Sequence, residues 1–192
     1  NQTIAVRDGI IRSVSPQPPA AREGDVVLDL KNQYVMPGLI DAHCHITMPG
    51  ASGISAGIFL DILNQLKRNY IQQLRQGITT IRDMGAMPKI LHANLDQIQK
   101  GELVGPRVVY CNAFTNIMGG HPDIDQREMG LLADMVMALT GESNMWFKDA
   151  DELREKMPQN SARGASFIKL TMDKISVLCG KEQLPAYSDE HL

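Results

Sequence analysis

The sequence predicts an α/β protein preceded by a small all-β segment. Two observations support this: short β-type runs fill residues 1–36, and from Pro37 onward β-rich runs alternate with helical ones. Alternating strands and helices favour a parallel sheet with right-handed crossovers. The sheet is either open and doubly wound or part of an eight-stranded barrel. No G-x-G-x-x-G follows the first strand of the alternating part, which weakens the dinucleotide-binding version of the open sheet.

Length and composition exclude several classes of protein. The chain has 192 residues, a formal net charge of -3 and 43% hydrophobic residues, which is typical of a globular domain and does not fit a polyanion binder. The sequence shows neither an apolar run of about 18 residues nor a secretory leader. Three scattered cysteines indicate reduced thiols and a cytoplasmic location. Because the chain lacks an initial Met and begins inside a predicted strand, we expect it to be a piece of a longer protein.

The N-terminal segment is predicted to contain four short strands. Residues 3–6 and 10–14 flank Asp8-Gly9, a pair typical of a two-residue hairpin turn. Residues 26–30 and 34–36 are β-rich as well. The segment is too small to be stable alone.

Residues 37–192 are predicted to contain four strands with helices between them. Apolar residues recur every three or four positions in residues 58–76, which predicts a helix ending at Gly77. Pro88 is expected to begin a second helix, which ends before Gly101. The third helix is expected at residues 151–163, with Asp149 or Asp151 as its cap. The predicted strands are residues 39–46, 78–83, 107–111 and 167–170.

Residues 129–147 form an insertion after the third predicted strand. Their apolar residues predict a short amphipathic helix, either as a lid over a site or as a packed excursion. A further helix is expected to begin at Ser188.

The strongest chemical signal is the H-x-H pair at the end of the strand predicted at residues 39–46. Residues i and i+2 of a strand point to the same face, so His43 and His45 present two imidazoles side by side, suited to one metal ion. Asp41 has the same parity and is a candidate acceptor for a ring N–H. Cys44 has the opposite parity and is not expected to act as a nucleophile. The alternative is two unrelated histidines on an exposed edge.

Lys169 lies inside an apolar strand sequence, Phe167–Leu170. Lysine is seldom fully buried unless it is paired, and burial favours the neutral amine. A neutral amine can react with carbon dioxide to give a carbamate, an anionic group with two oxygens that can bridge metal ions. The alternatives are an edge lysine that reaches solvent, or one paired with a carboxylate such as Asp83.

His121 follows two glycines and precedes Pro122. The glycines let the backbone approach a ligand closely, and the imidazole can bind a carboxylate or carbonyl oxygen or assist proton transfer. A turn with a surface histidine is the equal alternative.

The remaining charged positions have structural interpretations. Arg82 and Asp83 end the second strand of the alternating part, and the favoured interpretation is a structural ion pair. His92 and His191 fall in predicted helices and are expected on the surface.

Taken together, these motifs resemble those of the amidohydrolase superfamily. Val35–His45 resembles its first-strand motif, and Gly77–Asp83 resembles its second strand. Three further segments are similar to the branch of imidazolonepropionase-like and prolidase-like enzymes, which includes Xaa-Pro dipeptidases and zinc carboxypeptidases: Gly105–Val108, Gly119–His121 and Phe167–Leu170.

The resemblance implies a TIM-type (β/α)8 barrel beside a small β-sandwich. Residues 1–36 would form part of the sandwich, and residues 37–192 the N-terminal half of the barrel, with about its first four β/α units. A complete barrel of this type takes about 250 residues.

The resemblance also implies hydrolysis of an amide or peptide bond in a small molecule or dipeptide by metal-activated hydroxide. One or two divalent ions, usually zinc, would be held by His43, His45 and Lys169, the last carboxylated when it bridges two ions. Lys169 and His121 would be catalytic. Two alternatives stay open: a mononuclear cyclic-amide hydrolase or deaminase, and a non-catalytic scaffold.

The match departs from the superfamily pattern in two ways. Two histidines and a late aspartate that such sites need are not found by residue 192, and a glycine-rich stretch is replaced by residues 171–176. We therefore expect the 192-residue chain alone to be inactive and the intact protein to be a hydrolase. No nucleic-acid or membrane partner is expected, and a homo-oligomer is left open.

Overall fold

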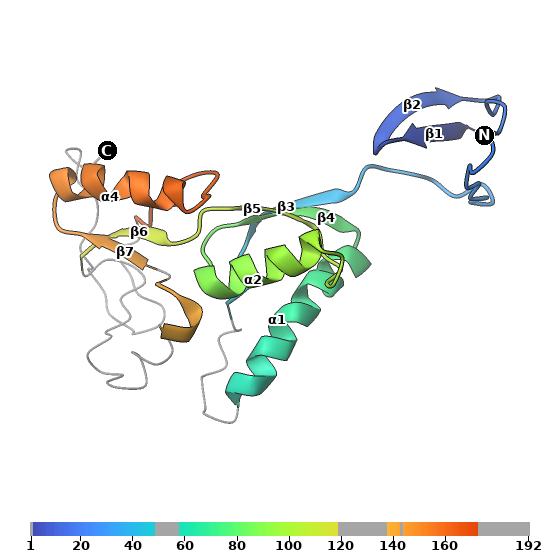
Figure 1. Cartoon of the computed structure of the whole chain (residues 1–192). Coiled ribbons are helices and arrows are strands. Elements are labelled where there is room, and N and C mark those ends of the chain that lie inside the picture. The colour runs from blue at the N-terminus through green and yellow to red at the C-terminus, as the bar shows by residue number, and fades with distance from the viewer. Residues whose placement is uncertain (1, 49–57, 119–137, 143, 173–192) are drawn as a thin grey trace. The chain divides into compact units, whose positions relative to one another are not determined.

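A computed structural model describes residues 2–48, 58–118, 138–142 and 144–172. The chain divides into two compact units, Asn1–Pro37 and Gly38–Leu192. The assignment of the first unit to a β-sandwich and of the second to a barrel stays a prediction. Figure 1 labels the elements of both units. No helix in the described ranges is both long and apolar enough to cross a membrane.

The first unit contains one antiparallel hairpin, as predicted. Its strands are β1 (Thr3–Arg7) and β2 (Ile10–Ser15). Asp8 and Gly9 have φ angles of 55° and 71°, the left-handed values that a tight hairpin turn requires. The predicted strands at residues 26–30 and 34–36 are wrong, because neither segment is extended against a partner. A β-rich sequence becomes a strand only where a neighbouring strand pairs with it.

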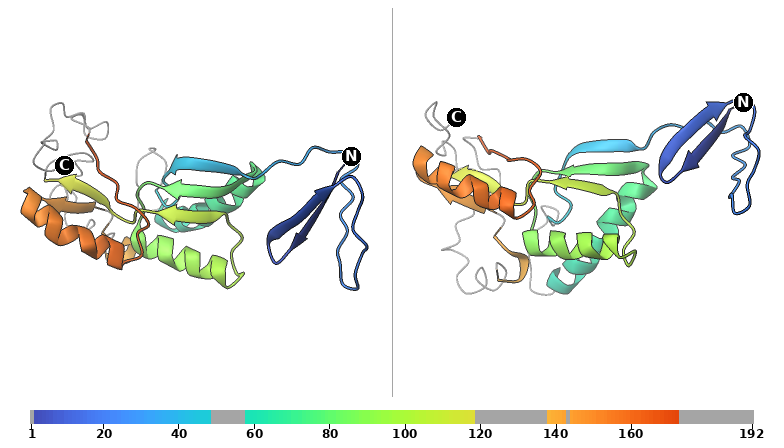
Figure 2. Two further views of the ribbon diagram at one scale, coloured as in Figure 1. Left: turned by 90° about the horizontal axis from the view of Figure 1, so that it is seen from above. Right: turned by 45° about the horizontal axis from the view of Figure 1, so that its top comes forward.

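The second unit contains a three-stranded parallel sheet in the order β3–β4–β5. Helix α1 (Ile58–Arg75) connects β3 to β4, and helix α2 (Pro88–Gln99) connects β4 to β5. Both helices pack on one face of the sheet (Figures 1 and 2). This is the predicted alternation of strands and helices. The strands are β3 (Leu39–Cys44), β4 (Ile78–Asp83) and β5 (Arg107–Tyr110).

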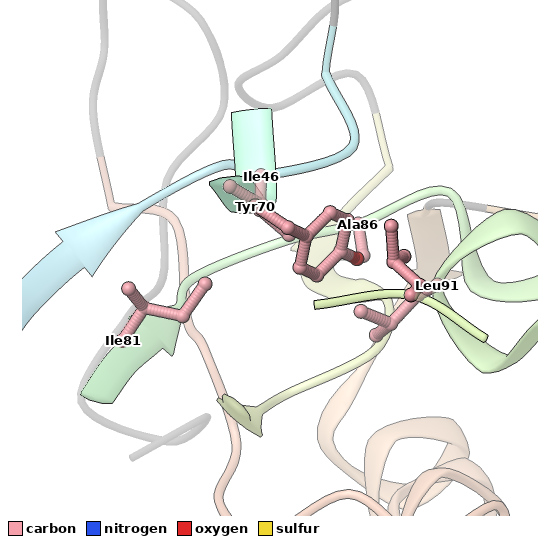
Figure 3. Close-up of a cluster of buried hydrophobic side chains, with 6 residues drawn as sticks. Ile46, Tyr70, Ile81, Ala86 and Leu91 are labelled. Carbon is pink, nitrogen blue, oxygen red and sulfur yellow. The ribbon is translucent and has the colours of Figure 1, made fainter. Parts of the chain in front are cut away.

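The main core lies between this sheet and its two helices. Tyr70 of α1, Ile81 of β4 and Leu91 of α2 are fully buried there, and Ile46 and Ala86 pack beside them (Figure 3). Each buried side chain of this size contributes roughly 1.5–3 kcal/mol by leaving water. The core therefore fixes the loops that follow β3 and β4, because Ile46 and Ala86 belong to them.

Local chemistry sets the ends of the helices as predicted. Gly77 follows α1 with a φ of 80°, a value that favours glycine, and Pro88 occupies the first turn of α2. Helix α4 (Ala150–Ala162) is capped by Asp149, whose side chain accepts a hydrogen bond from the Glu152 N–H at 2.9 Å.

A second, two-stranded parallel sheet was not predicted. It consists of β6 (Phe114–Ile117) and β7 (Asn144–Phe147). Residues 144–147, which we expected at the end of the amphipathic insertion, are thus a strand. The lid alternative for residues 129–137 and the helix predicted at Ser188 lie outside the described residues.

Residues 167–170, predicted as the fourth strand, form only a single β-bridge between Leu170 and Thr115. The Thr115 N–H also donates to the Lys169 carbonyl at 2.8 Å, so the segment runs beside β6 without a full ladder. Within the described ranges the two parallel sheets are separate and do not close into a barrel.

Candidate functional site

His43 and His45 lie side by side at the end of β3. Their ring centroids are 5.4 Å apart and the ring planes are inclined at 64°. His43 is exposed and His45 is half-buried. The rings therefore lie close together, and neither is fully buried.

A backbone carbonyl fixes the ring of His45. Its Nδ1 lies 3.0 Å from the carbonyl oxygen of Gly85. A carbonyl oxygen can only accept, so Nδ1 carries the hydrogen and Nε2 of the neutral ring keeps its lone pair. Histidines that bind metals usually donate their other ring N–H to a carbonyl or carboxylate in this way. The orientation of His45 therefore fits a metal ligand.

Asp83 joins the loops that follow β3 and β4. Its Oδ2 accepts a hydrogen bond from the Ile46 N–H at 3.0 Å, and its Oδ1 accepts one from the Gly85 N–H at 2.9 Å. Burial raises the pKa of Asp83 to about 6, although the two backbone N–H groups and the charge of His45 oppose the rise. The carboxylate is therefore held between the two loops.

The ion pair predicted between Arg82 and Asp83 is wrong. Within the described part of the chain, no ion pair includes either side chain. The Arg82 guanidinium instead lies 4.2 Å from the centroid of the Phe167 ring, a cation–π contact. Consecutive strand residues point to opposite faces, so Arg82 and Asp83 cannot easily meet.

The charge of Lys169 acts on His43. Burial lowers the pKa of His43, and the positive charge of Lys169 is the next largest cause of this lowering. Lys169 is itself half-buried beside β6. The structure therefore brings Lys169 into electrostatic contact with His43, although the two residues are far apart in the sequence.

Asp41 does not have the role predicted for it in the described structure. Its Oδ1 accepts the backbone N–H of His43 at 3.0 Å instead of a ring N–H. Among the described residues, no three side chains of the His, Cys, Asp and Glu types gather into a metal-binding group. His121 lies outside the described ranges.

Neither Cys44 nor Cys111, the cysteines within the described ranges, is a candidate nucleophile. Cys44 packs against the main core, and Cys111 is buried. Burial raises the pKa of each thiol to about 12, so both stay protonated near neutral pH.

His92, expected on the surface, is instead half-buried. Its Nε2 lies 2.9 Å from Oδ1 of Asn112, and its ring makes an edge contact with Tyr110 at 5.4 Å between centroids. His191 lies outside the described residues.

Sequence reasoning missed Gly85. Its φ is 151°, and a Cβ placed there would come within 2.2 Å of the Phe114 ring, so a larger residue forces the ring or the loop to shift. Phe114 in turn lies beside His45, with 5.6 Å between ring centroids. The signal available in the sequence was a glycine two positions after the end of a buried strand.

The chain alternates strands and helices, and two histidines lie at the end of its first parallel strand. Asp83 joins the loops that follow β3 and β4. The order of the elements and the histidine pair are those expected of an amidohydrolase. The chain belongs to the amidohydrolase family, whose family model matches residues 34–191. The predicted resemblance to the amidohydrolase superfamily is confirmed.

The similar sequences include imidazolonepropionases. The chain is 33% identical over 78 residues to the imidazolonepropionase of Salmonella arizonae, a match covering 41% of this chain and 18% of that protein. It is 38% identical over 50 residues to the Salmonella heidelberg enzyme, a match covering 26% of this chain and 12% of that protein. These matches span less than one fifth of either relative.

The similar structures include prolidases. A Xaa-Pro dipeptidase with bound methionine gives a TM-score of 0.71 at 21% identity and covers 98% of this chain and 46% of its own. A prolidase complexed with N-methylphosphonate-L-proline gives 0.70 at 22% identity and covers 94% of this chain and 44% of its own. At such identities the likeness concerns the fold, and the chain spans just under half of each structure.

Proposed function

We propose that the intact protein is a metal-dependent amidohydrolase that cleaves an amide or peptide bond in a small substrate, with a prolidase-like or carboxypeptidase-like dipeptide as the favoured class. The observation that carries this proposal is the His43–His45 pair, in which His45 donates Nδ1–H to the Gly85 carbonyl and keeps Nε2 free. Both histidines lie at the carboxyl end of a parallel strand, where active sites of barrel enzymes are found.

We also propose a fold for the intact protein. We infer that residues 37–192 supply about the first four β/α units of a TIM-type barrel and that residues 1–36 supply part of a β-sandwich. The parallel order β3–β4–β5 with its connecting helices supports the first assignment. The hairpin of β1 and β2 supports the second.

In this proposal His43, His45 and Lys169 hold one or two divalent ions. Amidohydrolases generally use divalent metals, and a bound zinc ion would supply a water activated near neutral pH and polarise the scissile carbonyl. Burial lowers the pKa of His43, which favours the neutral imidazole that can donate a lone pair. Lys169, carboxylated on Nζ, would offer two further oxygens. His121 would bind a substrate oxygen or move a proton.

A second candidate is a mononuclear cyclic-amide hydrolase or deaminase. The sequence matches to imidazolonepropionases favour it. The number of metal ions and the state of Lys169 distinguish the candidates: a carboxylated lysine with two ions supports the dipeptidase, and a free amine with one ion supports the cyclic-amide enzyme. A non-catalytic scaffold remains the third alternative.

The test uses the intact protein with Xaa-Pro dipeptides and a cyclic imidazolone as substrates. His43→Ala and His45→Ala should each lower kcat/KM at least about 100-fold and lower bound metal, because removal of a ligand costs at least as much as removal of its supporting partner. His92→Ala is the matched control, since His92 is also half-buried but bonds to Asn112. Unchanged activity in both histidine variants would contradict the proposal.

We also propose a cytoplasmic location and a small-molecule substrate, with a homo-oligomer left open. The 192-residue chain on its own is expected to be inactive. Turnover by that chain at an ordinary enzymatic rate would contradict this expectation.

A further inference from the structure

We propose that Asp83 is a positioning residue, which sets the tautomer and orientation of His45 by holding Gly85 through its backbone N–H. This inference rests on the proposed function, because it treats His45 as a metal ligand. Asp83 acts on the His45 ring through the backbone of the loop that follows β4.

Three consecutive hydrogen bonds form the connection. Asp83 Oδ1 accepts the Gly85 N–H at 2.9 Å, and the carbonyl oxygen of Gly85 lies 3.0 Å from Nδ1 of His45. Asp83 Oδ2 accepts the Ile46 N–H at 3.0 Å, directly after His45 in the chain. One carboxylate therefore holds both the residue that orients the ring and the backbone that carries the ring.

The surroundings of Asp83 make this carboxylate a support and not a ligand. Its side chain is 0% exposed, and each of its two oxygens already accepts a backbone N–H. Its register partner on β3 is Cys44, whose side chain packs against the core, away from the open side where His43 lies. Asp83 is therefore engaged on the covered side of the sheet.

An asparagine at this position keeps the size of the side chain but removes one acceptor. Its amide nitrogen must face either the Ile46 N–H or the Gly85 N–H, so two donors oppose each other in a buried place. The loop must shift to relieve that contact. We expect the Gly85 carbonyl to move away from His45 Nδ1, which leaves the ring free to exchange tautomers.

The test follows His45 in the intact, metal-free protein by long-range ¹H–¹⁵N correlation spectra, with the signal assigned by its loss in His45→Gln. The wild-type ring should be the single Nδ1–H tautomer, and Asp83→Asn should give a mixture of tautomers. Zinc affinity, measured by competition with a chelator, should fall about 10–100-fold in Asp83→Asn.

Thr47→Val is the matched control. Thr47 is buried, follows β3, and accepts the Met87 N–H at 2.7 Å, so it joins the same two loops without contacting Gly85 or Ile46 N–H. Its loss should lower the thermal stability of the protein while the His45 tautomer and zinc affinity stay near wild type.

Three results would overturn the inference. The first is a wild-type His45 that is not the Nδ1–H tautomer, a measurement that needs no variant to fold. The second is an Asp83→Asn protein that keeps the wild-type tautomer and zinc affinity. The third is a Thr47→Val protein that changes the tautomer and the affinity as much as Asp83→Asn does. If the tautomer depends on Asp83 but neither zinc binding nor hydrolysis is found, the positioning role stands and the proposed function fails.

Discussion

The β3–β4–β5 sheet and the N-terminal hairpin are built from strands of similar length, but they bury their apolar side chains very differently. Ile81 in β4 is 0% exposed because α1 and α2 cover its face, whereas Ile11 in β2 is 63% exposed. Two strands without a covering layer cannot form a core. Whether helices cover a β-rich segment, more than its strand propensity, therefore determines how far its apolar side chains are buried.

Equal substitutions in the two regions give the sharpest test of this difference. Ile81→Ala should lower the free energy of unfolding of the intact protein by about 2–5 kcal/mol, because it leaves a cavity in the main core. Ile11→Ala should cost less than about 1 kcal/mol. Denaturant unfolding of both variants measures the two values. Equal losses would show that the hairpin is covered as well as the sheet is.

The buried carboxylate of Asp83 gives the stability of the sheet unit a pH dependence. Burial raises the pKa of Asp83 to about 6 from an ordinary 3.8, so the folded protein holds this proton more tightly than the unfolded chain does. Its contribution to stability should therefore fall by up to about 3 kcal/mol as the pH rises from about 4 to about 6, and then level off.

This pH effect is measured as the difference in unfolding free energy between wild type and Asp83→Asn across that range. Asp8→Asn in the hairpin is the control, because the Asp8 side chain is 80% exposed and its ion pair with Arg12, at 3.8 Å, lies at the surface. A wild-type protein that gains stability relative to Asp83→Asn between pH 4 and pH 6 would reverse the predicted sign.

The comparison extends to the backbone through two glycines, Gly85 in the second unit and Gly24 in the first. Gly85→Ala must place a methyl group against the Phe114 ring, whereas a methyl group on Gly24, which has a φ of 86°, would meet nothing within 4 Å. Both variants carry the strain of a positive φ. Gly85→Ala should cost about 1–3 kcal/mol more than Gly24→Ala, from overpacking.

The same two variants should also separate in zinc binding, which the Gly85→Ala protein loses and the Gly24→Ala protein keeps. Equal affinities would show that a methyl group packed against the Phe114 ring does not move the Gly85 carbonyl away from His45.

The smallest expected effect concerns α4, whose start depends on one side chain. Asp149→Ala removes the acceptor for the Glu152 N–H and should cost about 1 kcal/mol. Asp151→Ala, in the first turn of the helix and exposed, should cost less. Thermal unfolding of the two variants distinguishes them, and a larger loss in Asp151→Ala would rule out Asp149 as the cap.

Local patterns predicted the elements that local chemistry determines. Asp8-Gly9 forms the predicted turn, Gly77 follows the end of α1 and Pro88 begins α2, and each acts within a few residues of its own position. Asp149, one of two predicted cap candidates with Asp151, caps α4. The β6–β7 pairing, by contrast, joins segments that the sequence separates by an insertion. Such pairing depends on partners that no local window contains.

The candidate site also combines a feature that the sequence predicts with one that it does not. Strand parity predicted that His43 and His45 share a face, because parity needs only a spacing of two. The Gly85 contact that fixes His45 spans 40 positions of sequence and involves a main-chain oxygen. Every residue has such an oxygen, so the sequence does not predict this contact. The predicted ion pair between Arg82 and Asp83 was wrong because the side chains of consecutive strand residues point to opposite faces.

The group that orients His45 is a peptide oxygen, which every amino acid carries. Conventional scanning mutagenesis replaces side chains, so it leaves this acceptor in place and reports on it only indirectly. Semisynthesis that exchanges the amide linking Gly85 and Ala86 for an ester would weaken the carbonyl as an acceptor while every side chain stays unchanged, although it would also delete the Ala86 N–H that now donates to the Asn112 carbonyl.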